Sequence, residues 1–176
     1  MITTTRIETE LGIMIAGAVD EGLCLLEFGD RRMLSTEYKD LERYLKTEIT
    51  EGENKHFLTV RTQLSEYFKG TRKEFSVPLV TPGTPFQQAV WKELMNIPYG
   101  STRSYLQQSA ALGKPGSIRA VAGANGMNRV SIIIPCHRVI GSDGNLTGYG
   151  GGLKRKRWLL EHEKKYSGKA HDQTLF

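Results

Sequence analysis

The sequence has 176 residues, of which 39% are hydrophobic and 24% charged, and its formal net charge at pH 7 is +5. This composition is that of a globular protein, long enough for one sizeable domain or two small ones. No apolar run approaches the roughly 20 residues of a membrane-spanning helix, and the N-terminus contains no apolar core of a signal peptide. We therefore expect an intracellular protein with no membrane association.

The charges are unevenly distributed along the chain. Acidic residues are concentrated in the first third, whereas the stretch from Arg103 to Arg157 contains a single anion, Asp143. The cations of that stretch are Arg103, Lys114, Arg119, Arg129, Arg138, Lys154, Arg155, Lys156 and Arg157. A basic half predicts a polyanionic partner, with nucleic acid the first candidate. The alternative is a solvated basic surface without a partner.

The two cysteines, Cys24 and Cys136, lie far apart in the sequence. Two cysteines do not form a disulfide framework, and neither has further ligands at metal-binding spacing. We therefore predict reduced thiols and no metal site. Cys24 lies within an apolar segment without a neighbouring cation, so we interpret it as a core residue.

The first half of the chain has the pattern of a small α+β domain. Alternating apolar residues with glycine-containing turns predict a strand meander over 3–28. Apolar residues three to four apart predict helices over 35–48 and about 55–69. Residues 75–79 are predicted to form a short strand, at a sheet edge because it contains Pro78.

The segment Thr81–Pro85 has the composition of a domain boundary. It also predicts a helix start, with Thr84 as N-cap and Pro85 at the first helical position, and this helix should continue to about Ile97. We therefore divide the chain into an N-terminal domain, a C-terminal domain and a loose tail, at 1–81, 82–166 and 167–176.

Two short helices joined by a glycine-containing turn follow, which is the pattern of a helix-turn-helix. Ser104 is predicted to cap the first helix, residues 105–112, and Ser117 the second, which extends to Gly126. In the second helix, one face (Ile118, Val121, Ala122) is suited to packing, and another has almost no side-chain bulk (Ala120, Gly123, Ala124). Small residues beside Arg119 favour a narrow groove of nucleic acid over base-edge recognition. The alternative is an ordinary helical hairpin of the core.

Residues 131–140 contain the best candidate for chemistry. Ile132–Ile134 are predicted to form a short buried strand that Pro135 ends. A thiol, an imidazole and a guanidinium follow directly, as Cys136, His137 and Arg138. A cysteine beside a base and a cation is a candidate nucleophile, because the thiolate is the reactive form. A buried structural cysteine is the alternative, and this segment alone does not decide between them.

The segment Pro135–Ile140 resembles the signature of the 6-O-alkylguanine-DNA alkyltransferases. The resemblance extends over about 86–163 and includes Ser117–Val121, Asn125-Gly126, Asn128, Gly148-Tyr149, Gly151-Gly152 and Lys156–Glu163. It implies an α/β (α+β) protein. A small N-terminal antiparallel sheet with helices, similar to ribonuclease H, would be followed by a mainly helical domain similar to a winged helix-turn-helix.

The same resemblance implies DNA repair by a single, irreversible transfer of a methyl or alkyl group from O6 of guanine, and less efficiently from O4 of thymine, to Cys136. By the same resemblance, no cofactor would take part. His137 would act as a base through a bridging water, and Glu163 would orient it. The sequence supports this role, because Glu163 follows Leu159 and Leu160 at helical spacing and would lie beside a buried stripe. The alternative for Glu163 is a solvated helix end.

Further roles implied by the resemblance concern DNA and the extruded base. Tyr105 would donate towards the base and help rotate the phosphate, Asn128 would brace the active-site turn, and Arg119 would fill the gap in the stack. The other implied contacts are the minor-groove helix 117–125 with Ser117, Ala120 and Gly123, the loop residues Tyr149 and Gly150, and the carbonyls of Cys136 and Val139. The partner would be double-stranded DNA containing 6-O-alkylguanine. The protein would be a monomer, cytoplasmic or, in a eukaryote, nuclear.

Three positions depart from the family pattern. Arg129 stands where proline is usual, Gln108 where an aliphatic residue is usual, and Ser131 at a pocket-wall position that is proline in some members. Because of these departures, three properties do not follow from the resemblance: the rigidity of the active-site turn, the packing of the helix over 105–112 and the tolerance of bulky alkyl groups. Two other functions are compatible with parts of the sequence: a cysteine hydrolase using Cys136 and His137, and a DNA-binding regulator without chemistry.

Overall fold

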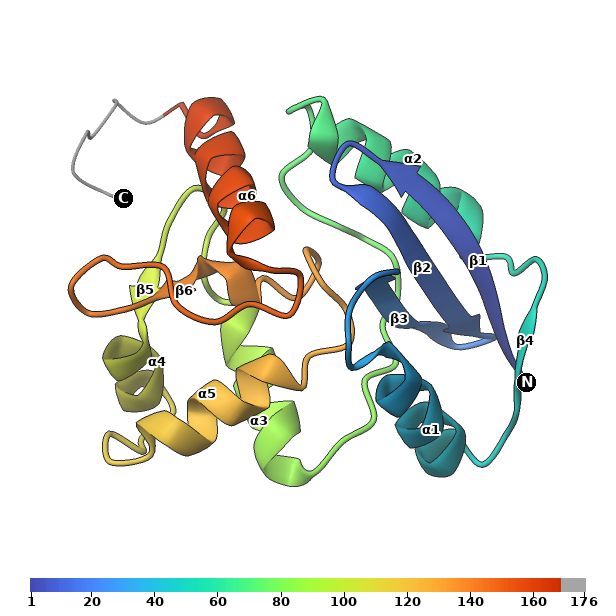
Figure 1. Cartoon of the computed structure of the whole chain (residues 1–176), viewed down its shortest axis with the longest axis horizontal. Coiled ribbons are helices and arrows are strands. Elements are labelled where there is room, and N and C mark those ends of the chain that lie inside the picture. Colours follow the sequence, from blue (N-terminus) through green and yellow to red (C-terminus); the bar gives the residue numbers. More distant parts are fainter. Residues whose placement is uncertain (169–176) are drawn as a thin grey trace. The chain divides into compact units, whose positions relative to one another are not determined.

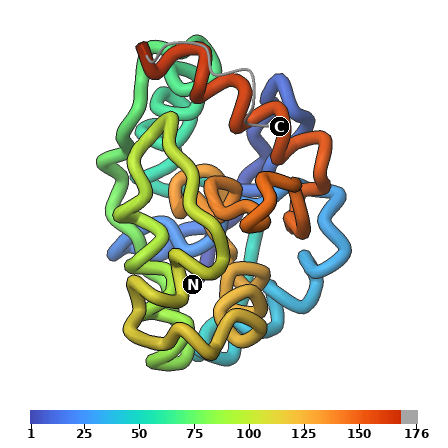
Figure 2. Tube along the Cα trace, turned by 90° about the vertical axis from the view of Figure 1, so that its left-hand side faces the viewer, coloured from blue at the N-terminus to red at the C-terminus, as the bar shows by residue number. Residues whose placement is uncertain are grey.

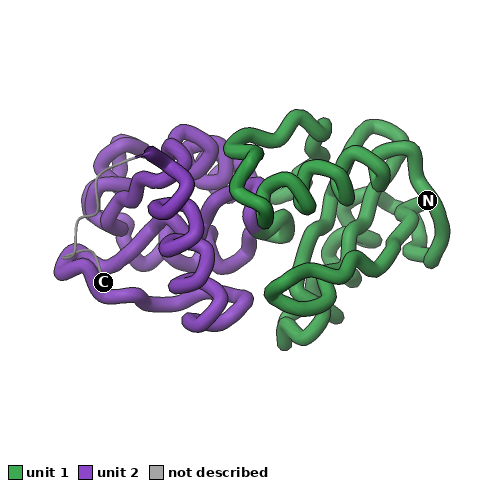
Figure 3. Tube along the Cα trace, turned by 90° about the horizontal axis from the view of Figure 1, so that it is seen from above, with its two compact units in different colours: residues 1–83, 129–131 green, residues 84–128, 132–176 purple. Residues whose placement is uncertain are grey.

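The computed structural model describes residues 1–168 and divides the chain into two compact units (Figure 3). Unit 1 comprises Met1–Gly83 with Arg129–Ser131, and unit 2 comprises Thr84–Asn128 with the chain from Ile132 onward. Of the predicted tail, residues 169–176 lie outside the described part of the chain. Over residues 1–168, no helix is both long and apolar enough to cross a membrane.

Unit 1 is built on a four-stranded sheet with the order β3-β2-β1-β4 (Figure 1). The predicted meander is confirmed as the antiparallel strands β1 (Ile2–Thr9), β2 (Gly12–Val19) and β3 (Gly22–Phe28). The small antiparallel sheet is confirmed, and it has one strand that the sequence did not predict, β4 (Ile49–Glu51), which pairs with β1 in parallel. This strand has three residues and one apolar side chain, too little for a period-2 pattern to reveal it.

Two helices complete unit 1 as predicted, α1 (Leu34–Leu45) and α2 (Phe57–Phe68). Leu41 of α1 packs in a buried cluster with Ile2, Leu25 and Cys24. Burial raises the pKa of the Cys24 thiol to about 12, although the positive charge of Arg129 opposes this shift. Cys24 is therefore a core residue as expected, but a cation does act on it.

The predicted strand over residues 75–79 is wrong. The structure has a single bridge there, between Leu79 and Leu23. The side chain of Gln63 takes the place of a partner strand, because its Oε1 accepts the backbone N–H of Ser76 at 3.0 Å and its Nε2 lies 2.6 Å from the Ser76 hydroxyl. Pro78 has no N–H to continue a ladder.

Unit 2 begins with α3 (Pro85–Leu94), whose predicted cap is confirmed: Thr84 and Gln87 form a capping box. The helix ends three residues earlier than expected, and Ile97 lies in the following turn. The remaining elements are β5 (Arg103–Ser104), α4 (Tyr105–Ala111), α5 (Ile118–Gly126), the 3-10 helix Cys136–Arg138, β6 (Val139–Ile140) and α6 (Leu153–Tyr166). Strands β5 and β6 pair in parallel.

Helices α4 and α5 form the predicted pair, joined by a short turn that can be followed in the trace of Figure 2. Ser104 caps α4 in a capping box with Gln107, but Ser117 makes no side-chain cap on α5. Its φ of −109° and ψ of 30° differ from the extended backbone from which an N-cap side chain reaches back.

The packed face of α5 is rotated relative to the prediction. Ile118 is 39% exposed, whereas Ala124 and Asn125 are buried beside Val121. A polar contact accounts for this rotation of the packed face: the side-chain amides of Asn125 and Gln108 form two hydrogen bonds with each other, of 2.6 and 2.8 Å, inside the helix pair. Apolar periodicity does not detect an amide that is buried with its partner.

The predicted strand Ile132–Ile134 is also wrong, although its side chains are buried as expected. These residues form a turn in which Ile132 has a φ of 73°, in the left-handed region that an extended strand cannot contain. The side-chain amide of Asn128 donates to the Ile134 carbonyl at 2.9 Å and holds the turn. A short apolar run has the same appearance in a buried turn and in a buried strand.

Candidate active site

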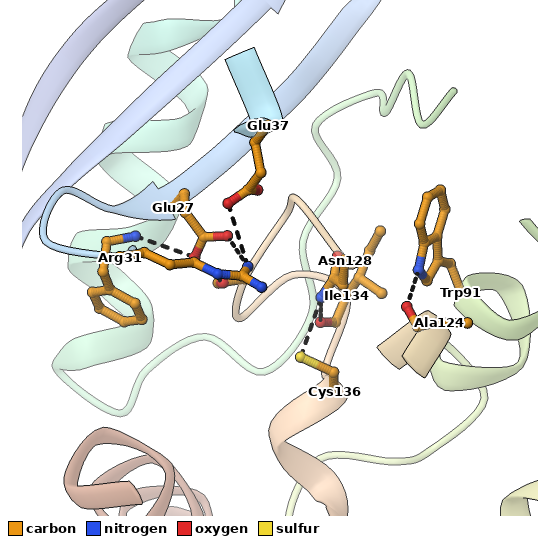
Figure 4. Close-up of polar contacts among 10 residues, drawn as sticks. Glu27, Arg31, Glu37, Trp91, Ala124, Asn128, Ile134 and Cys136 are labelled. Carbon is orange, nitrogen blue, oxygen red and sulfur yellow. Dashed lines mark hydrogen bonds and ion pairs between the residues drawn. The ribbon is translucent and has the colours of Figure 1, made fainter. Parts of the chain in front are cut away.

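Cys136 is the first residue of the 3-10 helix that follows this turn, and its side chain is partly exposed. Its backbone N–H donates to the Ile134 carbonyl at 2.8 Å. The Nδ2 of Asn128 lies 3.3 Å from the Cys136 sulfur and donates to the same Ile134 carbonyl (Figure 4). A donor aimed at the sulfur favours the thiolate over the thiol.

His137 and Glu163 form a fully buried pair. The Nε2 of His137 lies 2.9 Å from both carboxylate oxygens of Glu163, and the side chains are 0% and 1% exposed. Because Nε2–H donates to the carboxylate, the other ring nitrogen, Nδ1, carries the lone pair in the neutral ring. This Nδ1 is buried and accepts no hydrogen bond from the described residues. It is the atom available to take up a proton.

The protonation of this pair follows from its surroundings. Burial lowers the pKa of His137, and the attraction of Glu163 does not fully offset that effect. Burial alone would raise the pKa of Glu163, but the neighbouring His137 and Arg138 together lower it below its ordinary value. Near neutral pH the pair is therefore a neutral imidazole beside a carboxylate, which is the state that a general base requires.

Arg138 contacts Glu163 as well. Its Nε donates to Glu163 Oε1 at 2.7 Å, and its NH1 donates to the Ile97 carbonyl at 2.7 Å. The guanidinium carbon lies 5.7 Å from the centre of the Tyr99 ring. The sequence suggested Arg138 as a cation beside the thiol, whereas the structure pairs its guanidinium with Glu163. Only the position of Glu163 in the fold could reveal this.

Tyr105 and the segment 147–150 lie together in unit 2. The Tyr105 hydroxyl donates to the Thr147 carbonyl at 3.0 Å, and the Lys156 ammonium donates to the same carbonyl at 2.8 Å. The Tyr149 ring packs edge-on against His137, with centroids 6.4 Å apart, and Gly150 is exposed. Val139 is fully buried in β6.

Lys156 is a further residue of this cluster that the sequence did not mark as part of a site. Its side chain is 1% exposed, and burial lowers its pKa to about 8. A signal was present, because Lys156 precedes Leu159, Leu160 and Glu163 at helical spacing and so belongs to the same buried stripe. The formal positive charge of lysine favoured an exposed position instead.

The remaining residues assigned to DNA contact lie on α5 and at its N-cap, Ser117. Arg119, Ala120 and Gly123 are exposed, and Ser117 is half-buried. A Cβ atom added at Gly123 would meet no other atom within 4 Å, so this face of α5 is open. Ala124 does not belong to the open face, because it is buried and its carbonyl accepts a 2.9 Å hydrogen bond from Trp91 (Figure 4).

The three departures from the family pattern are all buried and hydrogen-bonded. Gln108 forms the amide pair described above. In unit 1, Arg129 donates to the Pro82 carbonyl at 2.6 Å, and the Ser131 hydroxyl donates to Glu27 at 2.8 Å. Among residues 1–168 no group of three or more histidine, cysteine or acidic side chains is arranged to hold a metal ion.

Comparisons with known proteins identify this arrangement. The model of the 6-O-methylguanine DNA methyltransferase DNA-binding domain matches residues 85–165, and that of the ribonuclease-like domain matches residues 2–81. Over 161 residues the chain is 42% identical to a methylated-DNA–protein-cysteine methyltransferase of Methanosarcina barkeri, covering 90% of this chain and 94% of that one. Over 114 residues it is 58% identical to one of Mycobacterium tuberculosis, covering 65% and 68%.

Solved structures give the same result over nearly the whole chain. The crystal structure of the Mycobacterium tuberculosis O6-methylguanine methyltransferase matches with a TM-score of 0.77 and 43% identity over 99% of both chains. The structure of the Mycobacterium tuberculosis protein OGT in complex with DNA matches with a TM-score of 0.78 and 41% identity, over 94% of this chain and 93% of that one. The chain belongs to the 6-O-methylguanine DNA methyltransferase family, whose N-terminal domain is ribonuclease-like and whose C-terminal domain is the DNA-binding domain.

Proposed function

We propose that Cys136 is the residue on which this DNA repair methyltransferase receives the alkyl group, from O6 of guanine and less efficiently from O4 of thymine. The observation that carries the proposal is the side-chain amide of Asn128, 3.3 Å from the Cys136 sulfur, next to the buried pair of His137 and Glu163. This combination provides a donor for the thiolate and a base for the thiol proton. Cys24 lies in the core, where burial raises the pKa of its thiol and so disfavours the thiolate.

In the proposed reaction, Nδ1 of His137 takes up the thiol proton through a bridging water, while Glu163 accepts from Nε2–H. The sulfur attacks the alkyl carbon, a sulfur–carbon bond forms as the carbon–O6 bond breaks, and the electron pair leaves with guanine. Negative charge develops on guanine as it departs; Tyr105 donates a hydrogen bond to the base, and the guanine anion then takes a proton from water. The thioether has no easy hydrolytic route, so each molecule reacts once.

Access to O6 requires that the nucleotide leave the paired interior of the duplex. We assign this step to α5, whose open face of small residues, Ala120 and Gly123, lets its backbone approach the minor groove. Arg119 would occupy the gap in the stack, and Ser117 would contact the backbone of the DNA. At the extruded base, Tyr149 and Gly150 would close over one side, and the Cys136 and Val139 carbonyls would accept from the amino edge.

For the chain as a whole, we propose that residues 82–166 carry the chemistry and the DNA contacts, and that residues 1–81 form a separate domain without chemistry of its own. The chain would act as a monomer on double-stranded DNA, in the cytoplasm or, in a eukaryotic host, in the nucleus. The crystal structure of the Mycobacterium tuberculosis relative in complex with DNA supports the choice of partner.

Intact-mass measurement after incubation with a duplex containing 6-O-methylguanine tests the proposal. We expect each protein molecule to gain one methyl group on Cys136, and Cys136→Ala to gain none. Cys24→Ala is the matched control, which should be methylated as the wild type is. Repeated turnover without modification would indicate a cysteine hydrolase, and DNA binding without modification would indicate a regulator.

A further inference from the structure

Lys156 is a buried cation in unit 2 to which the proposed reaction has given no role. Its ammonium group donates to the carbonyls of Thr147 at 2.8 Å and of Gly148 at 3.2 Å. Among residues 1–168, no carboxylate forms an ion pair with it. Burying a charge is costly unless it is hydrogen-bonded. The hydrogen bonds that stabilise this buried charge are made with the backbone just before Tyr149 and Gly150.

The Thr147 carbonyl has a second donor, the hydroxyl of Tyr105, at 3.0 Å. The Lys156 ammonium also lies 5.9 Å from the centre of the Tyr105 ring. A tyrosine hydroxyl has one proton, so Tyr105 cannot donate to Thr147 and to a base at the same time. To act on guanine, Tyr105 must release this carbonyl. A carbonyl oxygen has two lone pairs and can keep its bond to Lys156 when Tyr105 leaves.

We propose that Lys156 is a positioning residue for the alkyl transfer, which holds the Thr147–Gly148 backbone in place when the Tyr105 hydroxyl turns from the Thr147 carbonyl to the base. The inference rests on the proposed function, in which Tyr105 donates to the departing guanine. Lys156 does not itself contact the reacting atoms in this scheme. It lowers the free energy needed to free the tyrosine proton, because the carbonyl stays hydrogen-bonded.

The electrostatics of Lys156 agree with this position beside the reaction. Burial lowers its pKa to about 8, and the charge of Cys136 opposes that shift. The ammonium and the thiolate therefore stabilise each other, so the charged lysine is present when the nucleophile is. Lys156 joins α6, the segment before Tyr149 and the start of α4 through two hydrogen bonds and one ring contact.

A double-mutant cycle on the rate of methyl transfer tests the inference. The variants are Lys156→Met, which keeps the length of the chain without donors, Tyr105→Phe, and both together, assayed with a duplex containing 6-O-methylguanine. We expect Lys156→Met to slow transfer about ten- to a hundredfold, the effect of one charge-assisted hydrogen bond. In the Tyr105→Phe background the same substitution should slow it less than about threefold, because both residues act through one carbonyl.

Two further variants separate positioning from a general loss of structure. Lys156→Arg keeps the charge and the donors and should recover most of the rate, whereas Lys165→Met removes an exposed cation of the same helix and should leave the rate unchanged. DNA affinity and the melting temperature are measured for every variant. A rate loss that follows the loss of folded protein or of DNA affinity overturns the inference. So do independent losses for Lys156→Met and Tyr105→Phe that multiply in the double variant.

The wild type in the same assay separates this inference from the proposed function. If the wild-type protein gains no methyl group on Cys136, the proposed function fails and the role of Lys156 fails with it. If the wild type is methylated and Lys156→Met is methylated at the same rate, the proposed function stands and the positioning role of Lys156 is wrong.

Discussion

Each unit buries an arginine in contact with carboxyl groups, and the two clusters differ in their balance of charge. In unit 1, Arg31 lies between Glu27 of β3 and Glu37 of α1: its guanidinium contacts the Glu27 carboxylate, and its NH1 is 3.5 Å from Glu37 Oε1 (Figure 4). Two acids share one arginine there. Burial, followed by the negative charge of Glu27, raises the pKa of Glu37 to about 9, despite the opposing charge of Arg31. Glu37 is therefore protonated at neutral pH.

In unit 2 the proportion is reversed, because one acid, Glu163, lies between two basic side chains, His137 and Arg138. The pKa of Glu163 is lowered, so this carboxylate stays ionised although it is more buried than Glu37. Burial favours the neutral form in both clusters, and the number of basic neighbours decides which form exists. An ionised carboxylate accepts a hydrogen bond from the N–H of a base with either oxygen and can therefore orient that base. In a protonated carboxyl group, one of the two oxygens carries the proton instead.

Glu163→Gln should break the unit 2 cluster and have the largest effect. The amide leaves Arg138 without its buried counter-charge and can present its N–H₂ group to His137. Removing one partner of a buried ion pair costs about 3–5 kcal/mol of unfolding free energy. Loss of an oriented general base should slow methyl transfer about a hundredfold or more. Urea unfolding and intact-mass kinetics measure the two effects.

The control for this substitution is Glu161→Gln, which changes an exposed acid on the same helix. It should change unfolding by less than about 0.5 kcal/mol and leave transfer unaffected. The pKa of Glu163 is lowered on folding, so its contribution to stability exists above its unfolded pKa and is lost as the pH falls through the folded value. The difference between wild type and Glu163→Gln should therefore shrink in acid. A difference that grows in acid would contradict this assignment of charge.

Glu27→Gln should have the second-largest effect, in unit 1. Glu27 accepts hydrogen bonds from the Ser131 hydroxyl, at 2.8 Å, and from Arg31. Without the Glu27 carboxylate, the only acid left beside Arg31 in this cluster is Glu37, which lies 3.5 Å from Arg31 in the wild type. Loss of a hydrogen bond to a charged group costs about 1.5–3 kcal/mol. Ionisation of Glu37 in place of Glu27 limits the cost. Urea unfolding measures the loss of unfolding free energy, and Glu21→Gln, which changes an exposed acid, is the control. If Glu27→Gln loses as much unfolding free energy as Glu163→Gln, the balance of charge does not distinguish the two clusters.

Much of this comparison could be predicted from the sequence, but not the charge states. Cys136 and His137 are adjacent in the chain, and Glu163 follows Leu159 and Leu160 at helical spacing. The pair of His137 and Glu163 could therefore be predicted from the sequence pattern and the family resemblance. Strands β1 to β3 and the caps at Thr84 and Ser104 were predictable because they depend on local spacing. These features are encoded within about ten residues of one another.

What the sequence did not reveal depends on distant partners or on backbone angles. The left-handed φ of Ile132 turns an apolar run into a turn, and no periodicity records it. Arg138 contacts Glu163, 25 residues away, and Gln108 contacts Asn125, 17 residues away. In each case a polar side chain that propensity places on the surface is buried because another polar group meets it there. The fold supplies that partner.

Glu37→Gln should have the smallest effect in mild acid, because a neutral amide there replaces an acid that is protonated in the folded protein and only starting to ionise in the unfolded chain. We expect the free energy of unfolding at pH 5 to change by less than about 1 kcal/mol. The pH dependence should change more. A raised pKa in the folded state means that the stability contributed by Glu37 is complete below its unfolded pKa and is lost as the pH rises towards about 9.

Urea unfolding between pH 5 and 9 therefore separates the two clusters. Glu37→Gln should gain stability relative to the wild type as the pH rises over this range, because the variant lacks the carboxyl group whose contribution is lost. Glu8→Gln, which alters an exposed acid in the same unit, should leave the slope of the wild type unchanged. Because Glu163 contributes with the opposite sign and at lower pH, its removal cannot produce the same trend. Identical slopes for wild type and Glu37→Gln would mean that Glu37 is ionised in the folded protein, and the two clusters would then have the same charge state despite their different neighbours.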